Sequence, residues 1–152
     1  TPHLGEFAEL VKKSKDEIAK DSVSNLREVV YKTGATILLK GPCTTVALPS
    51  GKIYFNFSPN EAMATGGTGD VLAGILGGLL AQVYAKNRGS TESNVISPEV
   101  AEQIVLMSVG LHSESGRLAK LNSGSRTMNA SDLMDNFTAA FSSFEKMVYD
   151  KK

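Results

Sequence analysis

The residues best suited to chemistry lie in the stretch MATGGTGD, which begins at Met63 and runs into an apolar segment. A Gly-x-Gly turn that opens a helix leaves several backbone N–H groups unpaired and aimed outward, and the positive end of the helix dipole adds to their field. Glycine also lets a backbone approach a phosphate closely. The sequence therefore predicts an anion site over residues 66–69.

Asp70 follows these glycines directly. An acid beside a polyphosphate is electrostatically costly unless it serves as a base or holds a bridging metal. Lys40, at the end of a predicted strand over residues 35–39, supplies a cation for a second phosphate. The turn lacks the Lys-Ser/Thr that follows the glycines of a P-loop. It also lacks the Gly-x-Gly-x-x-Gly pattern of dinucleotide-binding proteins in the expected strand-turn-helix frame. Both residues could instead have a purely structural role. Asp70 would then stabilise the helix by interacting with its dipole, and Lys40 would be a solvated residue at the end of a strand.

An α/β framework must position these residues. Apolar spacing predicts helices over residues 6–13, from Asp16 through Val30 with Gly34 as the C-cap, and over residues 70–85. Ser97 and Pro98 open a further helix, and a last one covers residues 131–148. A hairpin is predicted over residues 44–48 and 53–57. Helices that alternate with short apolar strands favour an α/β domain with a largely parallel sheet.

Composition excludes several classes of function. The chain has 152 residues, and its 16 basic residues balance its 16 acidic ones, so we expect no nucleic-acid partner. Cys43 stands alone, which suits a reducing compartment, and we expect a cytoplasmic protein. The longest apolar run, residues 71–85, has about 15 residues where a membrane span needs about 20. It predicts a buried helix and no membrane partner.

Four ordered stretches, TPHLGEF, LLKGPCTTVALPSGKIYFN, MATGGTGDVLAGILGGLLAQ and VGLHSESGRLA, resemble the ADP/ATP-dependent NAD(P)H-hydrate dehydratases of the ribokinase-like superfamily. The resemblance spans nearly the whole chain and implies a three-layer α/β/α fold with a mostly parallel sheet. It also implies a repair lyase that phosphorylates the hydroxyl of hydrated NADH or NADPH and then releases phosphate. Family members carry about as much chain again upstream, so residues 1–152 are expected to be the C-terminal part of one nucleotide-binding domain that needs the missing N-terminal half.

The resemblance also assigns roles to residues. Asp70 would be the catalytic base and contact the substrate, and His3 would contact the hydrate. ADP or ATP would be the co-substrate, with Mg²⁺ bridging its phosphates and no metal ligand from the protein. Relatives suggest a homo-oligomer. The positions that match the nucleotide-binding residues of the family are Lys40, Gly41, Pro42, Cys43, Thr44, Gly67, Thr68 and Gly69.

Two other functions stay open at this point. A small-molecule kinase of the same superfamily, acting on a thiazole or pyrimidine alcohol, would use Asp70 in the same way but keep the phosphate on its product. An inactive nucleotide-binding fragment is the non-enzymatic alternative. For His3, the alternative to a substrate contact is an exposed loop residue with no ligand. His112 lies on a predicted helix and is interpreted as a core or interface histidine.

Overall fold

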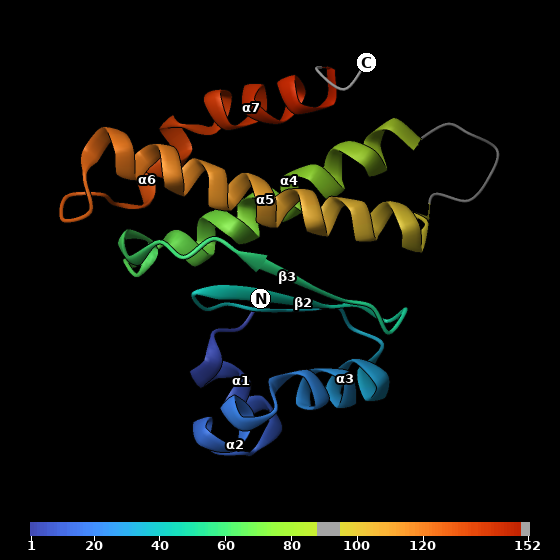
Figure 1. The fold of residues 1–152 in the computed structure, drawn as a ribbon. Coiled ribbons are helices and arrows are strands. Elements are labelled where there is room, and N and C mark those ends of the chain that lie inside the picture. The colour runs from blue at the N-terminus through green and yellow to red at the C-terminus, as the bar shows by residue number, and fades with distance from the viewer. Residues whose placement is uncertain (88–94, 150–152) are drawn as a thin grey trace. The chain divides into compact units, whose positions relative to one another are not determined.

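The computed structural model describes residues 1–87 and 95–149, and Figure 1 shows its ribbon. The chain forms two compact units, Thr1–Pro59 and Asn60–Lys152. His3, which is predicted to contact the hydrate, and most of the residues predicted to bind nucleotide fall in the first unit. The glycine turn and Asp70 fall in the second.

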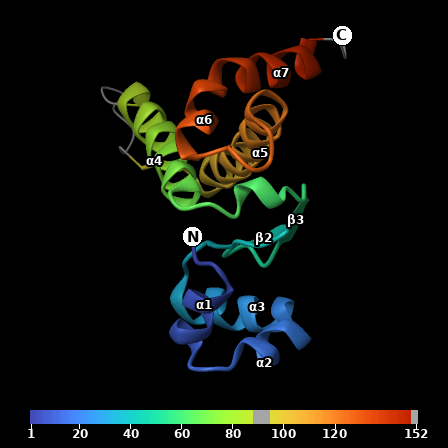
Figure 2. The same ribbon diagram turned by 90° about the vertical axis from the view of Figure 1, so that its left-hand side faces the viewer.

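The first unit consists of three helices and a three-stranded sheet with the order β1-β2-β3. Both views show the three helices gathered on one side of this sheet (Figures 1 and 2). Phe7, Ile18 and Leu26, which are fully buried, fill the core between helices and strands. Burial of such side chains stabilises the unit by about 1.5–3 kcal/mol each. The elements are α1 (Leu4–Val11), α2 (Lys15–Lys20), α3 (Ser22–Thr33), β1 (Ile37–Leu39), β2 (Cys43–Ala47) and β3 (Ile53–Phe57).

The helix predicted from Asp16 through Val30 is in fact two helices, α2 and α3. Asp21 separates them, because its backbone N–H closes α2 on the carbonyl of Ile18 while its side chain accepts from Ser24 N–H as the N-cap of α3. A short acidic side chain that competes for backbone donors favours such a cap over a helix interior. The predicted C-cap is confirmed, with Gly34 left-handed at φ 67°.

The strands of the sheet are antiparallel, where the sequence predicted a largely parallel sheet. The register pairs Leu39 with Thr45 and Val46 with Tyr54. Short turns join each strand to the next, and only antiparallel neighbours can be connected so briefly. A parallel contact is nevertheless present, as an isolated bridge between His3 and Lys40.

The second unit is helical, and its long helix α5 packs against each of the other elements. Ser97 caps α5 by accepting from Val100 N–H, and Pro98 occupies the first helical turn, as predicted. The last helix predicted from sequence is divided into two at Asn136, which ends α6. The elements are η1 (Glu61–Met63), α4 (Thr68–Asn87), α5 (Pro98–Ser123), α6 (Ala130–Asp135) and α7 (Phe137–Tyr149).

The prediction that the apolar helix after Asp70 is buried is wrong for this structure. Only 22% of its most apolar window is buried, and a Cβ added at Gly74, Gly77 or Gly78 would meet no atom within 4 Å. Within the second unit, the neighbours α5 and α6 cover part of the helix. By length and composition alone, Thr68–Lys86 could also cross a membrane, but one such helix is weak evidence because core helices pass the same test.

Candidate active site

His3 and Lys40 lie side by side at one edge of the first unit. The backbone N–H of Lys40 donates to the carbonyl of Pro2 at 2.8 Å, and His3 pairs with Lys40 in the parallel bridge. The segment before α1 therefore continues alongside the end of β1. Two residues 37 positions apart in sequence, each predicted to bind a ligand, are brought together by this pairing.

Glu6 joins them through a capping box. The Nδ1 of His3 accepts from the N–H of Glu6 at 3.1 Å, and Glu6 Oε2 accepts from the N–H of His3 at 2.7 Å. With Nδ1 as the acceptor, the tautomer that fits this contact carries its N–H at Nε2, which lies 3.4 Å from Glu6 Oε1. The backbone N–H of Glu6 thus selects the tautomer of the imidazole, and its carboxylate lies beside Nε2.

Charge at this edge is balanced by the same carboxylate. The hydrogen bond from the His3 N–H, followed by the charges of the His3 ring and Lys40, lowers the pKa of Glu6. The Nζ of Lys40 lies 3.9 Å from Glu6 Oε2, and its side chain is 26% exposed. At that separation the ion pair is weak, so the ammonium can turn toward an incoming anion at small cost.

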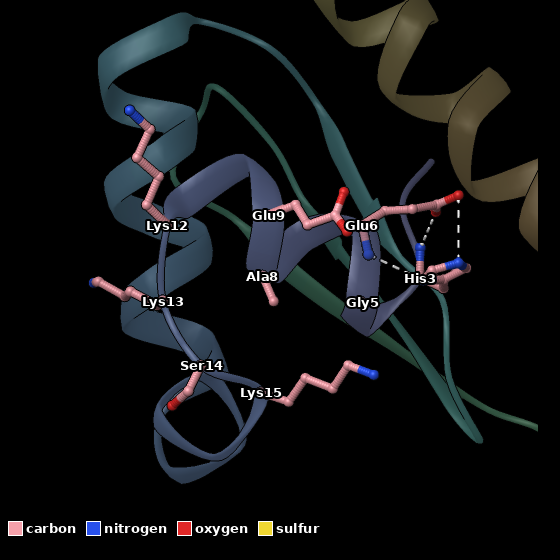
Figure 3. A pocket seen from close by; sticks show the side chains of 9 residues that line it. All are labelled: His3, Gly5, Glu6, Ala8, Glu9, Lys12, Lys13, Ser14 and Lys15. Atoms are coloured by element: carbon pink, nitrogen blue, oxygen red, sulfur yellow. Dashed lines mark hydrogen bonds and ion pairs between the residues drawn. The ribbon is translucent and has the colours of Figure 1, made fainter.

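A hollow of about 590 Å³ lies beside this cluster, on the side of α1 that faces the start of α2 (Figure 3). Gly5 brings its backbone under the His3 ring, where an added Cβ would come within 3.1 Å of Cε1. The His3–Glu6 capping box lines one part of the hollow, and three lysines line another. Its charged and ring-bearing lining residues are His3, Glu6, Glu9, Lys12, Lys13 and Lys15.

The remaining nucleotide-binding residues predicted in this unit form the connection between β1 and β2. Gly41 and Pro42 are exposed in the turn, and the thiol-bearing Cys43 is half-buried at the start of β2. Thr44 pairs with Asn56 of β3. Backbone groups of Gly41 and Pro42 in this exposed turn are able to contact a ligand, whereas Cys43 is paired with Phe57 in the sheet.

The glycine turn of the second unit opens α4. Gly67 has φ 88°, a left-handed conformation that favours glycine, and its carbonyl accepts the first helical bond, from Val71 N–H at 3.1 Å. The N–H groups of Thr68, Gly69 and Asp70 precede this first bond and point out of the helix end. A run of three amide donors with the positive helix dipole behind it has the chemistry to bind an anion, and this turn is the candidate anion site.

The turn is held by hydrogen bonds of Thr68 and its neighbours. The Thr68 hydroxyl lies 2.9 Å from the carbonyl of Met63 and 3.0 Å from that of Thr65. The Thr68 carbonyl accepts from Nε2 of His112 on α5 at 2.8 Å. Thr68 itself is buried at 8% exposure. The anion site therefore rests on a fixed loop.

Asp70 stands in the first turn of α4 with its side chain exposed. Within the described parts of the chain, no group of three His, Cys, Asp or Glu side chains could hold a metal ion. Mg²⁺ is usually bound by substrate phosphates, waters and one or two carboxylates. The donor set thus fits a Mg²⁺ that is held mainly by the phosphates of a nucleotide.

Comparison with known proteins decides the family. The profile described as NAD(P)H-hydrate dehydratase matches residues 1–139. The chain belongs to the NAD(P)H-hydrate dehydratase family. The bifunctional NAD(P)H-hydrate repair enzyme Nnr of Moorella thermoacetica is 36% identical over 135 residues, which are 89% of this chain and 23% of that protein. The ADP-dependent (S)-NAD(P)H-hydrate dehydratase of Neisseria meningitidis is 45% identical over 82 residues, or 54% of this chain and 28% of that protein.

Solved structures confirm the fold of this chain. The ADP/ATP-dependent NAD(P)H-hydrate dehydratase from Bacillus subtilis, co-crystallised with ATP and Mg²⁺, superposes with a TM-score of 0.76 at 29% identity. A ribokinase-like superfamily protein from Enterococcus faecalis gives a TM-score of 0.69 at 28% identity. These matches cover 94% and 93% of this chain but 46% and 43% of the solved chains. The chain thus spans less than half the length of these relatives, and its α/β, ribokinase-like class is confirmed.

Sequence reasoning missed two side chains of this candidate site. Glu6 could have been found, because an acid three residues after a helix cap is the signature of a capping box. His112 could not have been assigned to the turn, since 44 positions separate it from Thr68 and only the packing of α5 on α4 joins them. It is a contact between helices, as its interpretation as a core or interface histidine implies.

Proposed function

We propose that this chain forms the phosphate-binding and base-bearing part of an ADP/ATP-dependent NAD(P)H-hydrate dehydratase. The observation that carries the proposal is the N-terminus of α4, where three outward N–H groups stand with Asp70 in the same turn. The family match supplies the reaction class. The substrates are then an adenine nucleotide and hydrated NADH or NADPH.

The chain's own groups perform separate parts of this reaction. The Asp70 carboxylate takes the proton of the hydrate hydroxyl, whose oxygen then bonds to the terminal phosphorus as the bond to the nucleotide's leaving oxygen breaks. The outward N–H groups of Thr68, Gly69 and Asp70, together with the backbone of Gly67 that the family resemblance adds, hold the phosphoryl oxygens. Bound Mg²⁺ supplies further neutralisation of phosphate charge. Phosphate then leaves as the ring nitrogen donates its lone pair, and loss of a neighbouring C–H proton restores the reduced nicotinamide.

The first unit contributes the recognition of charge. We assign the Lys40 ammonium to a nucleotide phosphate, with the backbone of Gly41, Pro42, Cys43 and Thr44 beside it. His3, whose tautomer Glu6 fixes, is assigned to the hydrate. In this tautomer the Nε2–H can donate to a substrate oxygen, and the exposed ring leaves it accessible.

Asp70→Asn in the complete protein tests the role of the base. Removal of a general base lowers kcat by about 10²–10⁴-fold, while ADP binding measured by calorimetry should change little. Recovery of reduced-cofactor absorbance from the hydrate, with Mg²⁺ and either ADP or ATP, is the assay. Equal turnover by Asp70→Asn would refute the role of the base. Absence of recovery by the unmodified protein with either nucleotide would refute the dehydratase, and a stable phosphorylated alcohol would indicate a kinase instead.

We also propose that the remaining half of the complete protein covers α4. The support is the exposed apolar surface of this helix in a chain that spans 46% of a solved relative. Gly77 is the probe, because an added Cβ meets nothing in this chain and Gly77→Ala should stabilise it by up to about 1 kcal/mol through helix propensity.

In the complete protein the same Gly77→Ala change should instead destabilise, because the covering element leaves no room for a methyl group. Urea unfolding of both forms measures the sign. Stabilisation in both forms would show that this face stays open. A destabilisation that grows with protein concentration would show that a second copy, as in a homo-oligomer, covers it.

A further inference from the structure

The first turn of α4 is tied to α5 by one side chain. His112 places Nε2 at 2.8 Å from the carbonyl oxygen of Thr68. A carbonyl can only accept, so Nε2 carries a proton and donates it. His112 lies on α5 at a half-buried position, where water competes only partly for this bond.

The bond acts on an amide of the anion site through the peptide plane. The Thr68 carbonyl and the Gly69 N–H belong to one planar trans peptide unit, in which they point in opposite directions. A donor that fixes the carbonyl therefore fixes the direction of the Gly69 N–H. Hydrogen bonding at the oxygen also polarises the N–H at the other end and makes it a stronger donor.

A second attachment one turn further along α5 supports the first. Asn60 Nδ2 donates to the carbonyl of Gly116 at 3.0 Å, and the Met63 side chain packs on the glycine, with Sδ 2.1 Å from where a Cβ would lie. Residues 112 and 116 are four positions apart, so they share one face of α5. Both ends of the loop that leads into the turn are thus fastened to the same helix face.

We propose that His112 is a positioning residue that orients and polarises the Gly69 N–H for binding of the transferred phosphoryl group. The inference rests on the proposed function, because the amide matters only where an anion binds. It gives a role in the reaction to a histidine that does not itself touch substrate.

The test compares three variants of the complete protein. His112→Leu removes the donor, His112→Asn keeps a polar side chain that is too short to reach, and His112→Gln restores an N–H near the position of Nε2. The first two should lower kcat by about 10- to 100-fold with the hydrate KM unchanged, the range found when a residue that orients a metal ligand is removed. His112→Gln should recover most of the rate. Arg117→Gln, on the exposed face of α5, is the matched control and should keep the full rate.

A second readout is independent of turnover. In protein labelled with ¹⁵N-glycine, the ¹H shift of the Gly69 amide should move upfield in His112→Leu and His112→Asn and return in His112→Gln. Equal impairment of all three variants with an unmoved Gly69 shift would overturn the proposal and leave only a packing role. If the unmodified protein shows no dehydration, the proposed function fails, and the Gly69 shift still decides for or against His112.

Discussion

The contact between Met63 and Gly116 allows a quantitative test of how the loop before the glycine turn is seated. Gly116 is buried in α5, and a Cβ added there would lie 2.1 Å from Met63 Sδ and 3.2 Å from its Cγ. Alanine in place of a helical glycine stabilises by about 1 kcal/mol, but an extra methyl group in a packed site costs about 1–3 kcal/mol. With about 2 kcal/mol for the clash, Gly116→Ala should destabilise the protein by about 1 kcal/mol.

Removal of the methionine should reverse the sign. In a Met63→Ala background the three atoms nearest the added methyl group are absent, so Gly116→Ala should stabilise by about 1 kcal/mol, which gives a coupling energy of about 2 kcal/mol. Urea unfolding of the four proteins measures it, and the single variant should also lower Tm by about 2–4 °C. An effect of Gly116→Ala that is the same in both backgrounds would refute the reasoning.

Two further predictions concern the glycine turn and its flank. Gly67→Ala should destabilise by about 1–2 kcal/mol, because a side chain at φ 88° is strained and the new Cβ would lie 3.0 Å from that of Ala130. Gly66→Ala, whose Cβ meets nothing within 4 Å, is the control, and equal unfolding midpoints of the two variants would contradict this. Glu61, whose pKa the Lys120 hydrogen bond lowers to about 2, should stabilise the protein above its ordinary pKa near 4.5 and lose this effect as pH falls toward 2. Tm is measured against pH for the unmodified protein and for Glu61→Gln. Equal slopes of the two curves between about pH 2 and pH 4.5 would contradict this role of Glu61.

The candidate site could be read from the sequence wherever its chemistry is local. The glycines, the acid that follows them and the helix they open are contiguous, so a single stretch predicted the amide donors and Asp70 together. The caps at Gly34 and Ser97 were predictable for the same reason, since a cap involves residues within one turn.

The positions at which helices divide were not predictable from apolar spacing. The apolar spacing continues through Asp21 and Asn136, yet a helix ends at each of them. The Asp21 side chain accepts from the N–H of Ser24, and the Asn136 N–H donates to the carbonyls of Leu133 and Met134, so neither residue has the hydrogen bonds of a continuous helix. The periodicity of apolar residues reports which face is buried, and it is silent on where a polar side chain outcompetes the helix. The strand directions were likewise set by short turns rather than by the apolar content of the strands.

By itself the sequence determined the family, the glycine turn that opens a helix and the acid beside it, because these depend on residue types and their close spacing. Tertiary structure alone decided which distant groups meet. It placed Lys40 against His3 and Glu6, and His112 against the carbonyl of Thr68. It also left α4 exposed, because a helix that is apolar on all sides is buried only when other elements cover every side, and the described residues cover part of it.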